Sequence, residues 1–206
     1  MVYPTQENLS PEIFDFDKTL TYKDSTLGFF LFKEHRCKQI FLCLVFYLLA
    51  IGVKLQLINR KQHKECLLNL FFGRYSQDAL NQKAKDYAKT ILFQSWTKTI
   101  PWTQSPTKWV ITASWSAWVK PLFPENTQVI GSEFTKNTKQ QWVVDPHTEG
   151  EEKVLALAKH GIGSFGTVYT DSKRDAPLVK LSKQWVLIHP KGHSHGTDFK
   201  QFMRHA

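Results

Sequence analysis

Two aspartates one residue apart, Asp15 and Asp17, follow a short apolar segment near the start of the chain. If that segment is a strand that ends in a turn, the spacing of two can bring both carboxylates to the same side. Like charges at such short range repel each other unless a cation lies between them. Mg²⁺ suits this position because it takes oxygen ligands in an octahedron and keeps several waters. The pair therefore indicates a divalent-metal site at the end of the first strand.

Three further segments carry residues that could do chemistry. Residues 109–114 read Trp-Val-Ile-Thr-Ala-Ser, a predicted buried strand that ends in a hydroxyl residue. Residues 151–154 read Glu-Glu-Lys-Val and open a predicted helix, and residues 169–178 contain Thr-Asp-Ser-Lys-Arg-Asp-Ala-Pro-Leu. A lone Asp-x-Asp-x-Thr would mean little, but the four segments together are far more specific.

In their order along the chain, the four segments resemble the four motifs of the haloacid dehalogenase-type phosphatases. The helical stretch after the first motif is similar to subfamily IB, whose C1-type helical cap is inserted at that place. Phosphoserine phosphatases and the bacterial phosphatidylglycerophosphatase C type belong to this subgroup. The phosphatidylglycerophosphatase C type is the closer likeness, because the resemblance to it also includes the apolar stretch of the cap and residues 184–190.

The resemblance implies a role for each acidic residue. Asp15 would be the nucleophile that forms an aspartyl-phosphate, and Asp17 would act as general acid and then general base. Mg²⁺ would be held by the carboxylate of Asp15, the backbone carbonyl of Asp17 and Asp171. Asp175 would orient a lysine or a metal-bound water.

The same resemblance implies a phosphate-binding set. Thr112 and the amide of Ala113 would hold the phosphoryl group at the start of a helix, and Lys153 would neutralise its oxygens as a point cation. Lys18 stands where glycine is common in the superfamily, and its side chain would line the entrance or face water.

The elements that must position these residues alternate between strand and helix. We predict strands at about 10–20 (with the catalytic turn), 108–114, 127–134, 167–171 and 184–189, and part of a hairpin at 140–145. We predict helices over 26–94, interrupted at 52 and 72–74, and at 115–122 and 151–160. This order indicates an α/β fold, a Rossmann-like doubly wound parallel sheet with ligands at the carboxyl ends of its strands. The catalytic core would comprise residues 1–22 and 95–206, and the inserted helical cap residues 23–94.

The cap contains an uncharged apolar run at residues 40–53, with basic residues on both sides of it. Crossing a bilayer takes about 20 apolar residues, so the run is short for a span. A single span would also separate Asp15 from Thr112, Lys153 and Asp171. Two interpretations stay open: a helix or hairpin that lies in the membrane interface among anionic headgroups, and a buried helix of the cap bundle.

Composition narrows the possible partners. The chain has 206 residues, a formal net charge of +9 and three cysteines. The cysteines form no C-x-x-C pair, so neither a disulfide framework nor a zinc site is indicated, and a reducing cytoplasm is the simpler expectation. The polar N-terminus, residues 1–11, lacks the order of a secretory signal. No base-stacking signature accompanies the basic charge, so we expect no nucleic-acid partner. The oligomeric state is left open.

Two other patterns have plainer explanations. Residues 160–168 match the glycine pattern of kinases and dinucleotide-binding proteins, but here the glycines follow a helix and precede a strand, which favours a helix end and a turn. His189, His193 and His195 are expected in a polar tail after the last strand, where metal binding is not favoured.

The sequence as a whole predicts a Mg²⁺-dependent phosphomonoester hydrolase. The expected substrate is a membrane lipid phosphate such as phosphatidylglycerophosphate, with the enzyme in the cytoplasm and peripheral on the inner face of the cytoplasmic membrane. The alternative is a soluble phosphatase of a small phosphorylated metabolite. Within that alternative phosphoserine is less favoured, since residues 20–25 read Leu-Thr-Tyr-Lys-Asp-Ser and lack the acidic cap residue of that family.

Overall fold

The computed structural model describes residues 10–102, 108–190 and 192–206. Its strands are β1 (Glu12–Phe14), β2 (Lys108–Trp115), β3 (Gln128–Ser132), β4 (Phe134–Lys136), β5 (Trp142–Val144), β6 (Phe165–Thr170), β7 (Ser182–His189) and β8 (Gly192–Gly196). Its α-helices are α1 (Ser25–Leu31), α2 (Arg36–Lys54), α3 (Arg60–Phe72), α4 (Gln77–Ala88), α5 (Ser116–Val119), α6 (Glu151–Ala158), α7 (Ala176–Lys180) and α8 (Phe199–His205). Short 3₁₀ turns are η1 (Ser95–Thr99), η2 (Lys120–Leu122) and η3 (Lys173–Asp175).

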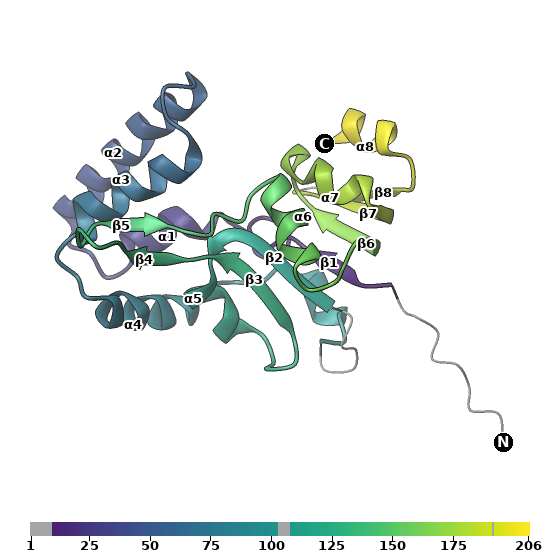
Figure 1. Ribbon diagram of the computed structural model, residues 1–206, viewed down its shortest axis with the longest axis horizontal. Helices are drawn as coiled ribbons and strands as arrows, with labels where there is room; N and C mark the ends of the chain where they lie inside the picture. Colours follow the sequence, from purple (N-terminus) through teal and green to yellow (C-terminus); the bar gives the residue numbers. More distant parts are fainter. Residues whose placement is uncertain (1–9, 103–107, 191) are drawn as a thin grey trace.

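Six strands form one sheet in the order β3-β2-β1-β6-β7-β8 (Figure 1). The pairs from β3 to β7 are all parallel, and β8 adds an antiparallel edge. Parallel neighbours need crossover connections, which the helices between them supply. The predicted α/β fold with a mostly parallel sheet is confirmed.

Both faces of the sheet are buried, as the apolar β1 segment predicts. Ile13 packs with Ile111 and the side chains of α6, α7 and α8, while the next residue, Phe14, packs in a second cluster with Val110 and Trp118. Successive side chains of a strand point to opposite faces, so a strand covered on both sides reads as a continuous apolar run. This is why Ile13 and Phe14, the two residues of β1 that directly precede Asp15, are both apolar and buried.

Helices α1 to α4 are inserted between β1 and β2, as predicted for the cap. They do not form a separate core, because Phe29, Leu68 and Phe72 belong to the same buried cluster as Phe14. The β4–β5 hairpin joins them: the indole of Trp142 donates to the carbonyl of Phe72 at 2.7 Å. The division into a core (1–22 and 95–206) and a cap (23–94) stays a prediction.

Two predicted boundaries are wrong. The helix break is not at Gly52, since α2 continues to Lys54 and the chain turns only at Gln56, whose φ is +60°. The last strand is not 184–189, since β8 follows it and contains His193 and His195. An exposed antiparallel edge strand has no covered face to enforce apolar residues, so its polar sequence resembled a tail. The glycines after α6 behave as expected: Gly161 has φ +76° just beyond the helix end.

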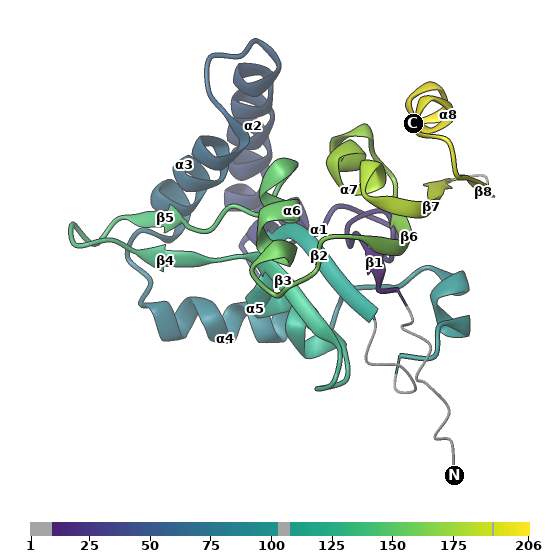
Figure 2. The same cartoon turned by 45° about the vertical axis from the view of Figure 1, so that its right-hand side comes forward.

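Helix α2 extends beyond both ends of the apolar run 40–53, and one face of it is exposed. It runs from Arg36 to Lys54 and is long and apolar enough to cross a membrane by length and composition alone. All of its residues are described, and Leu42 is the only one that is buried. The helix thus packs in the cap bundle through one face, that of Leu42, Val45 and Leu49, and is exposed on the other. Figures 1 and 2 show α2 and α3 as a hairpin that stands away from the sheet.

Candidate active site

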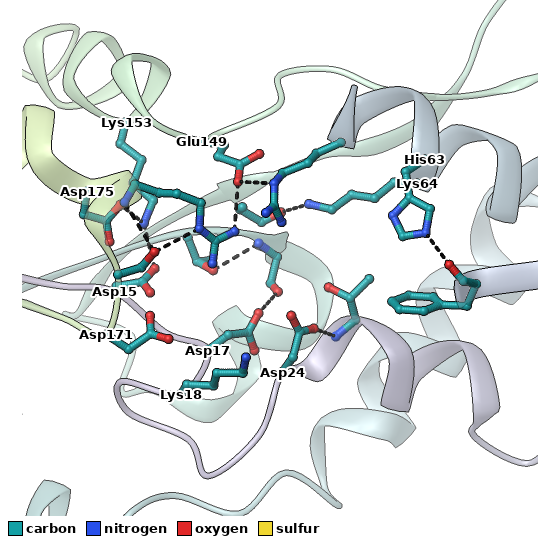
Figure 3. A pocket seen from close by; sticks show the side chains of 18 residues that line it. Asp15, Asp17, Lys18, Asp24, His63, Lys64, Glu149, Lys153, Asp171 and Asp175 are labelled. Atoms are coloured by element: carbon teal, nitrogen blue, oxygen red, sulfur yellow. Dashed lines mark hydrogen bonds and ion pairs between the residues drawn. The ribbon is translucent and has the colours of Figure 1, made fainter. Parts of the chain in front are cut away.

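The carboxyl ends of three neighbouring strands, β2, β1 and β6, meet at one pocket beside the inserted helices (Figure 3). This edge is where open α/β sheets bind ligands. The pocket lining includes every residue predicted for the site: Asp15, Asp17, Thr112, Ala113, Lys153, Asp171 and Asp175. The structure brings these residues together, while the role of each stays a prediction.

Lys153 is the centre of a buried ion-pair network. It lies in the first turn of α6, is 3% exposed, and its Nζ is 2.7 Å from Oδ1 of Asp15 and 2.7 Å from Oδ1 of Asp175. The second oxygen of Asp175 accepts a hydrogen bond from Thr170 Oγ1 at 2.7 Å. Asp175 therefore fixes the position of the ammonium group that faces Asp15.

Burial controls the protonation of this network. It raises the pKa of Asp15 to about 7; the ammonium of Lys153 opposes the shift, and the carboxylates of Asp175 and Asp171 add to it. Burial by itself lowers the pKa of Lys153, but the two carboxylates in contact with it outweigh this effect and the pKa is raised. Lys153 thus stays charged beside a carboxylate that is costly to ionise without further positive charge.

Asp17 is held by two residues that the sequence analysis missed. Its Oδ1 accepts from the backbone N–H of Ser25 at 2.8 Å, and its Oδ2 accepts from the hydroxyl of Ser114. Burial and the nearby Asp24 raise the pKa of Asp17 to about 6, while the hydrogen bonds from Ser114 and Ser25 lower it. A carboxyl group with a pKa near neutral can both give and take a proton.

A signal for Ser114 was present in the sequence. Two hydroxyl residues two positions apart, Thr112 and Ser114, point to the same side of a strand. Thr112 Oγ1 accepts from the N–H of Ser114 at 3.0 Å, so the pair forms a short local link. No local pattern marked Ser25, whose hydroxyl is 3.0 Å from that of Ser114 although 89 positions separate them.

The turn after Asp15 is tight. The N–H of Leu20 donates to the carbonyl of Phe16 at 2.9 Å, and Lys18 has φ +58°. Glycine adopts that conformation freely, whereas a side chain makes it cost about 1 kcal/mol. Lys18 lines the pocket, in agreement with the expectation that its side chain lines the entrance.

The surroundings of the Asp171 carboxylate show whether the pocket fits a divalent cation. Its carboxylate makes no hydrogen bond or ion pair with any described residue, and burial raises its pKa. A partly buried carboxylate without a partner, close enough to Asp15 to raise its pKa, fits a divalent cation between the two. The described residues contain no cluster of three His, Cys, Asp or Glu side chains of the kind that binds a metal alone. The predicted set needs only two carboxylates, since a backbone carbonyl and waters complete it.

The inserted helices contribute charged groups that the sequence analysis did not assign. Lys64 of α3 is 8% exposed and donates from Nζ to the carbonyl of Ala113 at 2.6 Å, so it ties α3 to the end of β2. Burial lowers its pKa to about 8. At the pocket mouth, Glu149 accepts from Arg174 at 3.0 Å and pairs with Arg60 of α3 at 3.4 Å. These contacts join the inserted helices to the loops around the predicted phosphate-binding residues.

Asp24 corrects one expectation. The stretch 20–25 is expected to lack the acidic cap residue of the phosphoserine phosphatases, yet Asp24 lines the pocket. It also caps α1 by accepting from the N–H of Thr26 at 2.8 Å. An acidic side chain from the inserted segment therefore faces the same space as Asp17.

The parallel sheet, the helices inserted after its first strand and the acidic residues at its strand ends define a class of α/β proteins whose pocket lies at those ends. The chain belongs to the haloacid dehalogenase-like hydrolases, since that family model matches residues 13–180. No curated protein matches the sequence.

Solved structures share the fold. A protein of unknown function from Bordetella pertussis Tohama I has a TM-score of 0.58 at 16% identity, over 84% of this chain and 86% of its own. A phosphoserine phosphatase solved as a phospho-aspartyl intermediate analogue has a TM-score of 0.57 at 13% identity, over 88% and 87%. An apo phosphoserine phosphatase has a TM-score of 0.56 at 13% identity, over 96% and 99%. At these identities the likeness shows the fold, and the substrate is left undetermined.

Proposed function

We propose that this protein is a Mg²⁺-dependent phosphomonoester hydrolase that acts through an aspartyl-phosphate on Asp15. The observation that carries the proposal is the buried Lys153, whose ammonium touches both Asp15 and Asp175 in the pocket. A buried cation beside a carboxylate nucleophile is what attack on a phosphate dianion requires, because it offsets the repulsion between two anions. Membership of a hydrolase family whose members generally use Mg²⁺ supports the same conclusion.

The reaction takes two displacements. An oxygen of Asp15 forms a bond to phosphorus as the bond to the ester oxygen breaks, and protonated Asp17 gives its proton to that leaving oxygen. Asp17, now a carboxylate, takes a proton from a water that attacks phosphorus and releases Asp15. Ser114 and the N–H of Ser25 hold Asp17 in place through both steps.

We assign phosphate binding to the residues around Asp15. Lys153 offsets the charge of the transferring oxygens as a point cation. Thr112 and Ala113 lie in the second half of β2, which ends at Trp115 just before α5. Lys64 donates to the Ala113 carbonyl at 2.6 Å, which fixes the orientation of that peptide. Bound Mg²⁺ would be held by Asp15, Asp171 and the Asp17 carbonyl, and would supply charge stabilisation and alignment of the phosphate.

Metal removal is the direct test of this assignment. Treatment with EDTA abolishes release of inorganic phosphate from a soluble aryl phosphate, and excess Mg²⁺ restores it. Replacing Asp171 by Asn raises the Mg²⁺ concentration needed for half-maximal activity by about tenfold or more, since one of two charged ligands becomes neutral. Full activity in the presence of the chelator would contradict the metal role of Asp171.

The acid role of Asp17 has its own signature. Replacing Asp17 by Asn slows hydrolysis of alkyl phosphates by about 10²–10⁴-fold, because their leaving oxygen needs a proton. Aryl phosphates with acidic phenols leave as anions and lose less in the first step. Measuring kcat across phenols of different pKa checks this, and an equal loss for every leaving group would point to a structural role.

Two substrate classes remain, each supported by a different observation. The fold likeness to phosphoserine phosphatases and the carboxylate of Asp24 in the pocket favour a small soluble phosphomonoester, with Asp24 facing a cationic substituent. The exposed apolar helix α2 favours a lipid phosphate such as phosphatidylglycerophosphate at the inner face of the cytoplasmic membrane. Phosphate release from a panel of soluble and lipid phosphomonoesters separates the two by kcat/KM.

A further inference from the structure

One face of α2 is largely uncovered in the described part of the chain, although Phe41 at its margin contacts Phe71 of α3, with ring centroids 5.8 Å apart. Six large apolar side chains on it are each between 52% and 67% exposed: Ile40, Phe41, Leu44, Tyr47, Leu48 and Ile51. At 3.6 residues per turn they fall within about a third of the helix circumference, so they form one stripe. The opposite face carries Leu42, Val45 and Leu49, which pack in the core. The helix is thus apolar on both sides, but the protein covers only one.

The apolar surface continues to the end of the hairpin. Beyond α2, Leu55 and Leu57 are 63% and 75% exposed in the connection to α3. Figures 1 and 2 show this end of the hairpin as a projection away from the sheet. A continuous exposed apolar stripe of this kind marks an interaction surface.

The charges beside the stripe have one sign. Residues 35–64 contain no Asp or Glu, but they contain six lysines and arginines: Arg36, Lys38, Lys54, Arg60, Lys61 and Lys64. Arg36, Lys54 and Lys61 make no ion pair within the described part of the chain, and Lys38 pairs with Glu34 at 2.7 Å. Such a surface is complementary to an anionic one. Two copies packed symmetrically through α2 would instead bring like charges together without a carboxylate between them.

The topology rules out a simple crossing of the bilayer. β1 and β2 pair directly in one sheet, so the chain must return to the side from which it left. Helix α3 would have to bring the chain back across the bilayer, but its first half contains Arg60, Lys61, Lys64 and Glu65. Those charges are costly in hydrocarbon. An apolar face with flanking cations, on a segment that cannot span, is typical of a helix that lies in the membrane interface.

We propose that the stripe on α2, extended by Leu55 and Leu57, docks this protein on the surface of a bilayer that contains anionic lipids. The apolar side chains enter the acyl boundary, and Arg36, Lys54 and Lys61 lie among the headgroups. The same hairpin supplies Phe46, Arg60, His63 and Lys64 to the pocket lining. Docking therefore brings the pocket to the membrane, and the consequence that it takes a lipid phosphate rests on the proposed phosphatase function.

The test is flotation of the full chain with vesicles. We expect binding to vesicles of phosphatidylcholine mixed with phosphatidylglycerol, stronger than to phosphatidylcholine alone by about fivefold for each cation that reaches the headgroups. The variant Leu44→Gln/Leu48→Gln/Ile51→Gln keeps good helix formers on the exposed face. Its partition coefficient falls by about tenfold for each side chain that would have entered the acyl region.

A matched variant controls for surface leucines in general. Leu92, Leu155 and Leu181 are 72%, 53% and 38% exposed and lie outside the hairpin. Leu92→Gln/Leu155→Gln/Leu181→Gln should bind vesicles like the unsubstituted chain. Both triple variants should hydrolyse a soluble aryl phosphate at the unsubstituted rate, which shows that they are folded.

Three outcomes would overturn the docking proposal: no binding of the unsubstituted chain to either vesicle, undiminished binding of the α2 variant, or a dimer in solution that the α2 variant converts to monomers. The last would assign the stripe to a second copy. Failure of the proposed function is separable, because Asp15→Asn removes catalysis and leaves vesicle binding unchanged. A chain that binds vesicles but hydrolyses no phosphomonoester would refute the phosphatase alone.

Discussion

Replacing Asp15 by Asn lowers kcat for phosphomonoester hydrolysis by about 10³-fold or more. The amide has the shape of the carboxylate but is a poor nucleophile and a weak metal ligand, so the covalent intermediate does not form. Losses of this size are typical when a covalent nucleophile is removed from a group of residues that act as a unit. Steady-state assays with a soluble aryl phosphate and saturating Mg²⁺ measure the change.

Folding of the Asp15→Asn variant is the control for that result. Asp15 is buried beside Asp175 and Asp171, and its pKa is raised to about 7, so the ionised form is costly in the folded chain. The neutral amide removes that cost, although it also loses the ion pair with Lys153. We expect a thermal unfolding midpoint close to that of the unsubstituted chain. A folded Asp15→Asn variant with activity within tenfold of the original would assign the nucleophile to another residue.

Replacing Lys153 by Met damages both catalysis and stability. The ammonium contacts Asp15 and Asp175 at 2.7 Å each, and Met fills a similar volume without charge. Loss of one charged group aimed at the transferring phosphate lowers kcat/KM by about 10²–10³-fold. Breaking a buried ion pair by removal of one partner lowers the free energy of unfolding by about 3–5 kcal/mol, because the carboxylates are left buried without compensation.

The pH dependence of this loss identifies its cause. Without Lys153 the pKa of Asp15 in the folded state, already raised to about 7, rises further above its unfolded value. A group whose folded pKa is raised in this way destabilises the fold once the pH exceeds its unfolded pKa, so the stability difference grows from acid to neutral pH. Urea unfolding of both proteins in metal-free buffer, once at acid pH and once at neutral pH, measures this stability difference. The charge-preserving Lys153→Arg variant should recover much of the stability, and less of the activity, since Arg is not a compact point charge. A pH-independent loss would mean that packing, not charge, had been removed.

The sequence by itself determined the local elements and most of the candidate site. Apolar runs predicted β1, β2 and β6. Asp15 and Asp171 directly follow β1 and β6, Thr112 lies in the second half of β2, and Lys153 lies at the start of α6. These predictions succeeded because a strand buried on both faces appears as a continuous apolar run, and the residues that follow it are adjacent in the sequence. The order of strand and helix then restricts the topology to very few arrangements, all with these ends at one edge.

The sequence could not determine contacts between residues far apart in the chain. Ser25 and Lys64 belong to the inserted helices, and their contacts with Asp17 and Ala113 depend on how those helices pack against the sheet. Asp24 was misjudged for the same reason, since its place in the pocket follows from the start of α1. Edge strand β8 was missed because an edge position relaxes the apolar pattern that marks inner strands.

The exposure of α2 is the largest difference that only the tertiary structure decided. An apolar run has the same composition whether its helix is buried in a bundle or uncovered on one face, because hydrophobicity describes what a surface prefers and not what lies against it. Here the other inserted helices cover the side of Leu42 and leave the stripe from Ile40 to Ile51 uncovered. Local sequence thus specified which residues gather around Asp15, whereas packing between distant segments decided which surfaces stayed exposed.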